Sequence, residues 1–401
     1  MPSRRWFLRT SGMAVSLLGT SPMWMVPAAA QSTDRRKVLV AVFQRGAADG
    51  LNVVAPFFEK RYYQLRPSLA VPAPGPPNSG LDLDGRFALN PAMQPLKPLW
   101  ESGQLAIVHA AGSPDPSRSH FDAQEFMESG TPGTKLDDGW LNRAIPLTSD
   151  NASPMRAIAV GTQIPRTLRG DRNAMVVDDL NRFQVGSNDA ATLLKQLYAA
   201  APDARMKAQG AGVFDAIRSI DALRQQPYTP ANGAQYQSEF GRRLMQIARL
   251  IKGNVGVEVA FVDLDGWDHH TNEAGALPNL LRDFSTSLAA FTRDLGDRIA
   301  DVVVVTMSEF GRTAAENGTG GTDHGHGGVM MVLGGPVKGG VMYGKWPGLE
   351  AEQLYEGRDL EVATDFRNVL AELVDGHLGQ KTDRVFPGFT PGAPLGLLRR
   401  V

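Results

Sequence analysis

The chain of 401 residues contains no cysteine, and this absence removes several kinds of chemistry at once. Without thiols there is no disulfide, no thiolate metal ligand and no cysteine nucleophile. A dominant charge is missing too, because 41 Lys and Arg balance 42 Asp and Glu and leave a formal net charge of −1. The composition therefore does not predict binding to nucleic acid or to an anionic membrane surface.

Long hydrophobic runs are also missing beyond the N-terminal region, so no later stretch is long enough to cross a bilayer. Hydrophobic residues make up 42% of the chain and aromatic residues 7%, which is ordinary globular composition. The length suits one large domain or two medium ones. Because no internal repeat and no convincing linker interrupts the pattern, we expect a single domain after the N-terminal segment.

The segment 1–30 predicts an export signal. It carries the pair Arg4-Arg5, then a mildly apolar run, then an A-x-A cleavage site before Gln31. The twin arginines indicate the Tat export machinery. A short membrane anchor is the alternative, but Gly, Ser and Pro interrupt a run that is already short for a span. We expect a periplasmic or secreted mature domain over 31–401.

Continuous apolar runs along the chain are typical of buried parallel strands. The expected strands are 37–46, 105–112, 156–161, 256–266, 301–311 and 327–335. The expected helices are 91–102, 119–129, 203–225, 234–252, 276–297 and 364–379. This alternation predicts a doubly wound α/β fold. The proline-rich segment 66–80 fits neither element, and we expect a surface excursion there.

Polar side chains of the kinds that do chemistry follow several of these strands. In an open parallel sheet, ligands bind outside the carboxyl ends of the strands. The residues found there are Asp49 after the first strand, Ser117, Ser119 and His120 after the second, Asp268, His269 and His270 after 256–266, and Glu309 and Arg312 after the apolar run 301–307. A sheet could bring these four groups together at one edge.

Some of these residues also have a purely structural interpretation. Asp49 precedes Gly50 and suits a turn, Ser119 suits the N-cap of a helix, and Glu309 could pair with Arg312 in a salt bridge. The segment D-G-W-D-H-H could be a solvated loop, although adjacent carboxylate and imidazole groups after a buried strand favour a metal site.

The glycine-rich segment G-T-G-G-T-D-H-G-H-G-G, residues 318–328, holds Asp323, His324 and His326. Asp and His are the usual donors for Zn²⁺ or Mn²⁺ when thiolates are absent. Alternate residues of an extended segment point the same way, so the two histidines could share a site, or one could support the other. The remaining pair, His109 and His377, falls in a strand and a late helix, and we expect structural roles for both.

Five motifs occur together in this order: R-G-A-A-D-G-L-N-V-V-A-P-F, R-S-H-F-D-A-Q-E-F-M-E-S-G, D-G-W-L-N-R, G-W-D-H-H-T-N-E, and S-E-F-G-R-T-A-A-E-N-G-T-G-G-T-D-H-G-H-G-G. With the twin-arginine leader, they resemble the bacterial family catalogued as domain of unknown function 1501, over essentially the whole mature chain. That family looks like a branch of the alkaline phosphatase superfamily, which includes sulfatases. The resemblance implies a three-layer α/β/α sandwich with a mostly parallel sheet and a metal site at its carboxyl edge.

The resemblance also implies roles for individual residues. Asp49 matches the metal-binding aspartate after the first strand. Ser119 matches the nucleophile that opens a helix, with Ser117 as the runner-up. Asp268 and His270 match the Asp-and-His motif after a central strand.

A later Asp-His pair of the superfamily is replaced here by Glu309-Phe310, which keeps the carboxylate and loses the imidazole. His324 could fill that gap, and His326 matches the distal histidine ligand. Together with Asp323, these residues imply one or two divalent ions, Zn or Mn.

The function implied is an exported metal-dependent hydrolase of phosphate or sulfate esters, with a serine nucleophile beside His120. Arg143 or Arg312 could clamp the nonbridging oxygens of the anionic ester, because a guanidinium matches them bidentately. The alternative is a catalytically inactive metal-binding scaffold with the same fold, and a phosphomutase is a third interpretation. The sequence selects no particular ester and no oligomeric state.

Overall fold

A computed structural model describes residues 35–146, 153–182, 196–200 and 204–399. Contacts divide the chain after Arg35, so that residues 36–401 make up one unit. The expected export signal over 1–30 lies outside the described residues. None of the helices in the described part of the chain is both long and apolar enough to span a membrane.

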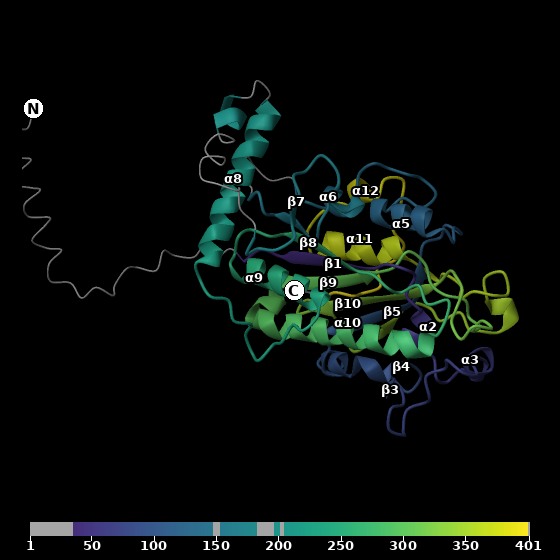
Figure 1. Cartoon of the computed structure of the whole chain (residues 1–401). Coiled ribbons are helices and arrows are strands. Elements are labelled where there is room, and N and C mark those ends of the chain that lie inside the picture. The colour runs from purple at the N-terminus through teal and green to yellow at the C-terminus, as the bar shows by residue number, and fades with distance from the viewer. Residues whose placement is uncertain (1–34, 147–152, 183–195, 201–203, 400–401) are drawn as a thin grey trace, which may run out of the picture. The chain divides into compact units, whose positions relative to one another are not determined.

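A mixed sheet organises this unit (Figure 1). Its strands are β1 (Val38–Gln44), β5 (Leu105–Gly112), β6 (Ala157–Val160), β7 (Met175–Val177), β8 (Val259–Leu264), β9 (Val302–Met307), β10 (Gly328–Gly334), β11 (Met342–Tyr343) and β12 (Thr364–Asp365). The strand order over the described residues is β11-β5-β10-β9-β1-β8-β6-β7, and β12 also pairs with β5.

Most pairs in this sheet are parallel, as the sequence predicts. β1 pairs in parallel with both β8 and β9, and β6 pairs in parallel with β7 and β8. The exception is β10, which is antiparallel to β5 and to β9. The expected fold class, a mostly parallel sheet flanked by helices, is confirmed.

Helices cover both faces of the sheet (Figure 1). The longer ones are α5 (His120–Ser129), α8 (Ala204–Arg224), α9 (Glu239–Lys252), α10 (Glu273–Leu295) and α11 (Phe366–Gly376). The short ones are α2 (Gly50–Val53), α3 (Lys60–Leu65), α4 (Lys97–Glu101), α6 (Trp140–Arg143), α12 (Thr382–Val385) and the 3₁₀ turns η1 (Pro91–Leu96), η2 (Arg166–Leu168), η3 (Gly296–Asp301) and η4 (Ala351–Gln353).

Alternate residues of β1 enter two separate hydrophobic layers. Val40 and Val42 pack with α9 and α10 on one face, whereas Leu39 and Phe43 pack with α6, α11 and α12 on the other. All seven residues of β1 are buried, which explains why the strand is a continuous apolar run. Each fully buried aliphatic or aromatic side chain contributes about 1.5–3 kcal/mol. The layers therefore hold the ends of the strands in fixed positions.

Two features differ from the sequence-based expectation. The predicted helix 91–102 is a 3₁₀ turn followed by the short α4, because Pro95 and Pro98 cannot donate to a helical ladder. A small second sheet, β2 (Val54–Ala55), β4 (Ala88–Leu89) and β3 (Leu81–Asp82), was not predicted because its strands have only two residues each.

Two buried histidines make the stability of the fold sensitive to acid. His109 in β5 donates from Nε2 to the carbonyl of Val54 at 2.8 Å, and His377, which follows α11, donates to the carbonyl of Val38 at 3.0 Å. Burial lowers the pKa of each to about 4. As the pH falls below about 6.5, these histidines bind protons in the unfolded chain but stay neutral in the folded chain. The free energy of unfolding is therefore highest above pH 6.5, and it falls by about 3 kcal/mol per histidine between about pH 6.5 and 4.

The substitution His377→Gln tests this dependence, because the glutamine amide can still donate to Val38 but does not titrate. Urea unfolding of both proteins at about pH 7 and about pH 4 gives the free energies. We expect the variant to lose about 3 kcal/mol less than the wild type over this range. Equal losses would show that His377 does not contribute to acid unfolding.

Candidate metal centre

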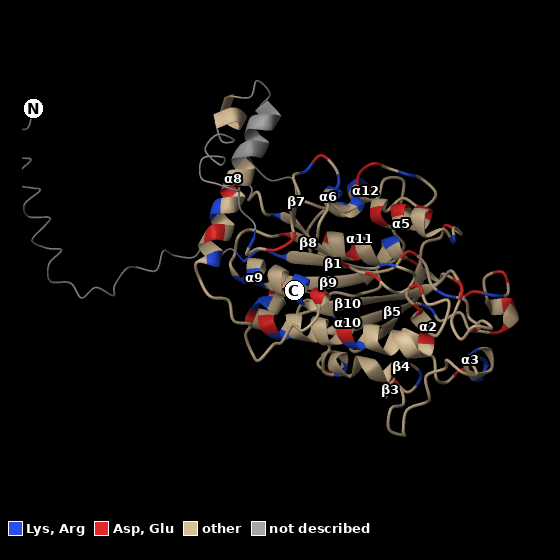
Figure 2. Cartoon of the chain, viewed as in Figure 1, with Lys and Arg blue, Asp and Glu red and all other residues tan. Residues whose placement is uncertain are grey.

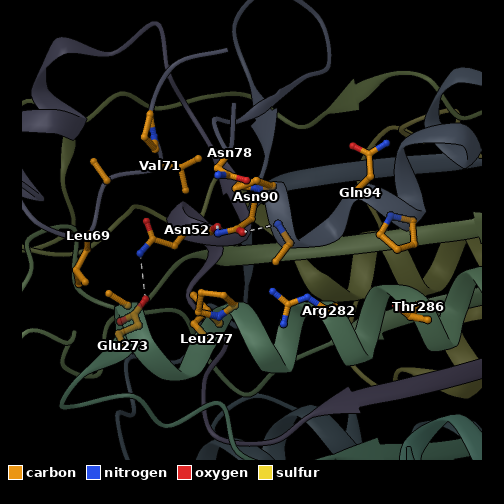
Figure 3. A pocket seen from close by; sticks show the side chains of 17 residues that line it. Asn52, Leu69, Val71, Asn78, Asn90, Gln94, Glu273, Leu277, Arg282 and Thr286 are labelled. Atoms are coloured by element: carbon orange, nitrogen blue, oxygen red, sulfur yellow. Dashed lines mark hydrogen bonds between the residues drawn. The ribbon is translucent and has the colours of Figure 1, made fainter. Parts of the chain in front are cut away.

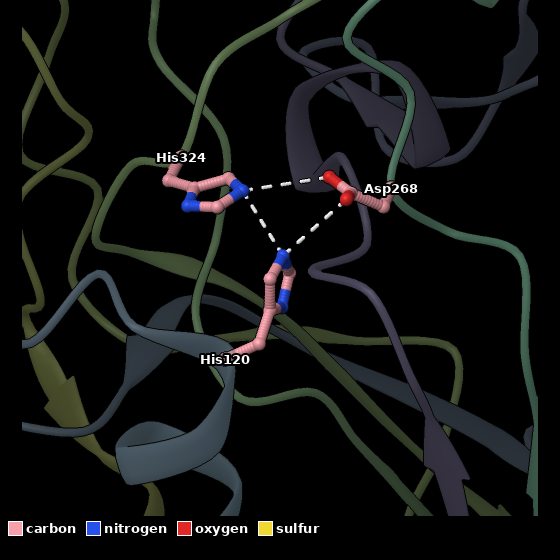
Figure 4. A group of neighbouring side chains, drawn as sticks. All are labelled: His120, Asp268 and His324. Carbon is pink, nitrogen blue, oxygen red and sulfur yellow. Dashed lines mark hydrogen bonds and ion pairs between the residues drawn. The ribbon is translucent and has the colours of Figure 1, made fainter.

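The carboxyl ends of β1, β5, β8 and β9 meet at one edge of the sheet, because these strands run in the same direction. β10 begins at that edge, because it runs the opposite way. The segments after β5 and β8 and the segment before β10 therefore converge. They bring together His120, Asp268 and His324 of the glycine-rich segment (Figure 4), and the loop residue His270 lies beside Asp268.

Ring nitrogens of His120 and His270 both lie close to a ring nitrogen of His324 in this cluster. The Nε2 of His324 lies 3.0 Å from Nε2 of His120 and 2.9 Å from Nε2 of His270. The carboxylate of Asp268 completes the group. Its Oδ1 lies 3.1 Å from Nε2 of His270 and 3.5 Å from Nε2 of His324, and its Oδ2 lies 3.5 Å from Nε2 of His120.

The other nitrogen of each ring is already engaged with an acceptor. Nδ1 of His120 lies 2.8 Å from Oε1 of Glu309, and Nδ1 of His270 lies 2.9 Å from Oδ1 of Asp323. Nδ1 of His324 lies 2.8 Å from the carbonyl oxygen of Arg118. Carboxylates and carbonyls accept hydrogen bonds, so each Nδ1 carries the ring proton. In the neutral imidazoles, each Nε2 therefore presents a lone pair to the others.

The Nε2 lone pair of His324 meets that of His120 and that of His270, and such lone pairs repel each other unless a cation lies between them. Donation of the second ring N–H to a carboxylate or carbonyl is the usual arrangement of histidines that bind a metal. In a tetrahedral zinc site with bonds of about 2.0–2.1 Å, neighbouring ligand atoms are about 3.3 Å apart. The distances in this cluster, from 2.9 to 3.5 Å, lie on both sides of that value. The ligand atoms of His120, Asp268 and His324 all lie within 4.8 Å of one another, so these three residues fit one divalent ion, and His270 lies beside them.

The pKa values of the histidines follow from their surroundings. The hydrogen bond to Glu309 raises the pKa of His120, whereas burial lowers the pKa of His324. For Glu309, burial would raise the pKa, but the hydrogen bonds that it accepts hold the pKa below its usual value. Glu309 is thus ionised and keeps the proton of His120 on Nδ1, away from the centre of the cluster.

Glu309 is fully buried and connects the strand ends. Its Oε1 accepts hydrogen bonds from the backbone of Gly46 at 2.9 Å, from His120, and from Nε2 of Gln124 at 2.9 Å. Gln124 lies one helical turn after His120 on α5, so one carboxylate positions both side chains. Gln124 was not singled out from the sequence, although its i+4 spacing from His120 is a usable signal.

The substitution Glu309→Gln is expected to keep the fold but weaken zinc binding by about 10–100-fold, because an amide supports the imidazole of His120 less strongly. Competition with a chromophoric zinc chelator measures the change. Glu128→Gln is the matched control, since Glu128 lies on α5 with His120 but bonds Thr167 and Arg45. Equal zinc affinity of the two variants would exclude this supporting role.

Arg312 holds the loops of the centre in place. Its guanidinium is buried and donates to the carbonyls of Ala47 at 2.8 Å, Gly46 at 2.6 Å and Thr322 at 3.0 Å, and it also bonds Asp268. Ala47 has a φ of 64°, which costs a non-glycine residue about 1 kcal/mol. The bond from Arg312 to its carbonyl helps to hold this turn.

The glycines of the segment 318–328 allow its backbone to approach two neighbouring loops. A Cβ on Gly321 would lie 2.5 Å from the carbonyl oxygen of His269, and a Cβ on Gly325 would lie 2.4 Å from the carbonyl oxygen of Arg312. Side chains at these two positions would push His324 away from the cluster. The glycines therefore shape the loop that carries this histidine.

Four of the residues expected from the sequence lie apart from this group or turn to other partners. Asp49 is buried against the guanidinium of Arg66, with Oδ1 2.9 Å from Nη2. Arg143 donates to the carbonyls of Ser129 and Val385 and to Asp138. The ring of His326 stacks on Tyr355 with centroids 4.3 Å apart. Ser119 is the N-cap of α5, and its Oγ lies 3.5 Å from the backbone nitrogen of Asp122.

Two cavities are lined by residues that bond to the loops of the candidate centre. The first cavity has a volume of about 610 Å³ and lies between α10 and the segments around η1 and 66–80. In its wall, Asn52 donates a hydrogen bond to Glu273 at 3.1 Å (Figure 3). The second, about 530 Å³, lies between α5 and the carboxyl ends of β6 and β8. Only the second is lined by Gln124, which is bonded to Glu309 of the metal centre.

The fold and the site together define an α/β protein with a cluster of histidines, a candidate metal centre, at the carboxyl edge of its sheet. The chain belongs to the family described as protein of unknown function (DUF1501), whose model matches residues 100–385. No curated protein matches the sequence.

Two solved structures are similar at low identity. The C-terminal periplasmic domain of EcEptC from Escherichia coli, solved in complex with Zn, is 11% identical with a TM-score of 0.35, over 76% of this chain and 74% of that one. The lipoteichoic acid synthase LtaP from Listeria monocytogenes is 10% identical with a TM-score of 0.32, over 75% of this chain and 65% of that one. Both likenesses are too distant to assign an activity.

Proposed function

We propose that this protein is an exported, zinc-dependent hydrolase of phosphate or sulfate esters, active in the periplasm or outside the cell after passage through the Tat machinery. The observation that carries the proposal is the group of His120, Asp268 and His324, whose ligand atoms all lie within 4.8 Å of one another, with Nε2 of His270 a further 2.9 Å from Nε2 of His324. Such a set of three nitrogens and one oxygen suits Zn²⁺ better than the oxygen-rich sites of Mg²⁺ or Ca²⁺. Mn²⁺ is the second choice for the same ligands.

One ion fits these residues better than two. Phe310 is buried where the superfamily resemblance implies a histidine, and its ring packs on His120 and His324 with centroids 4.9 and 5.0 Å apart. Asp49, the other implied ligand, has both carboxylate oxygens bonded to Arg66. A second site would need both of these positions.

The residues of the chain have distinct roles in this proposal. His120, His270, His324 and Asp268 would hold the ion, which supplies Lewis-acid chemistry by polarising an ester oxygen and neutralising developing charge. Glu309 and Asp323 keep the ring protons on Nδ1, so that the Nε2 atoms stay free to bind. Arg312 fixes the loop of Asp268.

Ser119 is the proposed nucleophile, because it opens α5 directly before His120. At a helix N-terminus the backbone dipoles favour a negative charge and so assist loss of the hydroxyl proton. Attack of Oγ on phosphorus or sulfur would form a covalent seryl ester and release the alcohol. Water would then cleave that ester and return the serine.

Hydrolysis of 4-nitrophenyl phosphate and 4-nitrophenyl sulfate by the exported, zinc-loaded protein tests this proposal. We expect Ser119→Ala to lower kcat at least about 100-fold with unchanged zinc content, because the nucleophile is lost and the ligands are not. Ser117→Ala is the matched control. A Ser119→Ala variant with wild-type kcat would overturn the serine mechanism.

A second candidate function is a metal-binding scaffold without turnover. It is favoured by the fact that both arginines expected to clamp the ester are used elsewhere: Arg143 binds α12 through the carbonyl of Val385, and Arg312 binds backbone carbonyls and Asp268. Stoichiometric zinc without hydrolysis of either ester would support the scaffold and refute the hydrolase.

A further inference from the structure

The cavity of about 530 Å³ beside the metal centre, here called the α5 pocket, has the size of a ligand site. Phe121, Gln124, Glu125 and Glu128 of α5 form one wall, and the ends of β6 and β8 form the others. Phe121 directly follows the metal-centre residue His120. Gln124 is bonded to Glu309, which in turn is bonded to His120. The pocket therefore adjoins the centre along the first turn of α5.

Charged side chains of both signs line the α5 pocket in equal number. They are Arg45, Arg166, Arg169, Arg243, Glu125, Glu128, Asp263 and Asp265. Many of them pair within the wall: Arg45 bonds Glu128 at 3.0 Å and Asp263 at 2.8 Å, and Arg166 bonds Glu125 at 2.8 Å. The pocket thus has no net formal charge from these residues, and Figure 2 likewise shows both signs interspersed over the molecule. A strongly anionic ligand gains little attraction here.

The same wall is unsuited to an alkyl chain. Guanidinium, carboxylate, hydroxyl and amide groups dominate it, and burying them against a hydrocarbon would cost their hydrogen bonds with water. A ligand that both donates and accepts hydrogen bonds along its length avoids this cost. Thr162 and Gln163, at the carboxyl end of β6, add uncharged groups of this kind.

Phe121 gives the pocket one aromatic surface. Its side chain is 87% exposed and lines the cavity at the end next to His120. An exposed phenyl ring offers a flat face on which the C–H side of a saturated ring can pack, with gain from apolar contact. Hydroxyl groups on the rim of such a ring can meanwhile bond the polar wall.

We infer that the α5 pocket binds a neutral, polyhydroxylated ring, a sugar unit, and that this unit is the alcohol part of the ester cleaved at the metal centre. The second half of the inference depends on the proposed function, whereas the first half does not. The ester group would lie at the centre, and the sugar would extend along α5 with its C–H face on Phe121.

The test measures binding of four neutral disaccharides, maltose, cellobiose, galactobiose and mannobiose, to the zinc-loaded full chain by saturation-transfer NMR titration. We expect at least one to bind, with affinity at least about tenfold lower in Phe121→Ala and retained in Phe121→Trp, which keeps a stacking face. Tyr198→Ala is the control for loss of an exposed aromatic outside the pocket. Binding of none of the four, or equal binding by Phe121→Ala, would overturn the inference.

A parallel measurement separates this inference from the proposed function. The variant His270→Ala/His324→Ala, which lacks two of the zinc-binding side chains, is expected to bind the same disaccharide as the wild type, since neither residue lines the pocket. Sugar binding that depends on Phe121, without ester hydrolysis by the wild type, would support the sugar site and refute the hydrolase. Hydrolysis of the aryl esters without binding of any of the four disaccharides would support the hydrolase and refute the sugar site.

Discussion

The double substitution His120→Ala/His324→Ala is expected to abolish stoichiometric metal binding. The purified wild-type protein should carry about one equivalent of zinc, and the variant should bind it at least about 100-fold more weakly, because two of four donor atoms are lost. Mass spectrometry of metal content after dialysis against a weak chelator gives both values. Circular dichroism checks that the variant still folds, which we expect because both side chains are partly exposed to solvent.

His326→Ala is the matched control for this experiment. His326 lies only two residues from His324, but its ring stacks on Tyr355 instead of joining the cluster. We therefore expect His326→Ala to retain its zinc. Loss of zinc in this variant, with retention in His120→Ala/His324→Ala, would show that the ion binds on the other side of the glycine-rich loop.

The different positions of His324 and His326 show where sequence reasoning stops. Alternation along an extended segment places i and i+2 on one face, but this holds only in a regular strand. Here His324 forms an isolated bridge with Arg312, and the regular strand β10 begins only at Gly328. Between these points the glycines allow the chain to turn, so the two rings diverge.

The strands themselves were predictable because buried strands appear in the sequence as continuous apolar runs. The run 105–112 coincides with β5, since a strand with both faces covered must be apolar at every position. The direction of β10 was not predictable, because a buried antiparallel strand has the same composition as a parallel one. The direction of β10 is decided by the pairing pattern of the whole sheet, and no local sequence pattern indicates that pairing.

The convergence of four strand ends was also predictable, and it placed His120, Asp268, His270 and His324 in one region. The contacts of the arginines were not. Arg312 donates to the backbone carbonyls of Gly46 and Ala47. The sequence around these two acceptors contains no pattern that predicts such bonds. The partner of Asp49 is likewise found in the proline-rich excursion, where Arg66 is fully buried.

The buried pair of Arg66 and Asp49 leads to the second large expected effect, on stability. Arg66 donates from Nη2 to Oδ1 of Asp49 at 2.9 Å and from Nε to the carbonyl of Ala314 at 2.9 Å. Burial alone would raise the pKa of Asp49, but the neighbouring guanidinium outweighs burial and holds the pKa below its usual value. Asp49 is therefore ionised inside the protein, and Arg66 is what makes this possible.

The substitution Arg66→Met is expected to lower the free energy of unfolding by about 3–5 kcal/mol, because it leaves a buried carboxylate without its partner. Urea unfolding at about pH 7 measures the loss. The double variant Asp49→Asn/Arg66→Met is expected to lose less than Arg66→Met alone, since no charge then remains to be compensated. A double variant as unstable as the single one would show that shape, and not charge, makes the pair important.

A third variant, the single substitution Asp49→Asn, tests whether Asp49 binds the metal. Burial, followed by the charge of Asp49, raises the pKa of the nearby Glu273. Glu273 accepts a hydrogen bond from Thr322 of the glycine-rich segment at 2.8 Å, so the buried network supports the loop that carries His324. If Asp49 acts only through this support, Asp49→Asn keeps its equivalent of zinc while its unfolding free energy falls. If Asp49 is itself a ligand, Asp49→Asn loses its zinc in addition to the fall in unfolding free energy that the unpaired Arg66 causes. Zinc content and unfolding free energy, measured on one sample, therefore distinguish a structural carboxylate from a coordinating one.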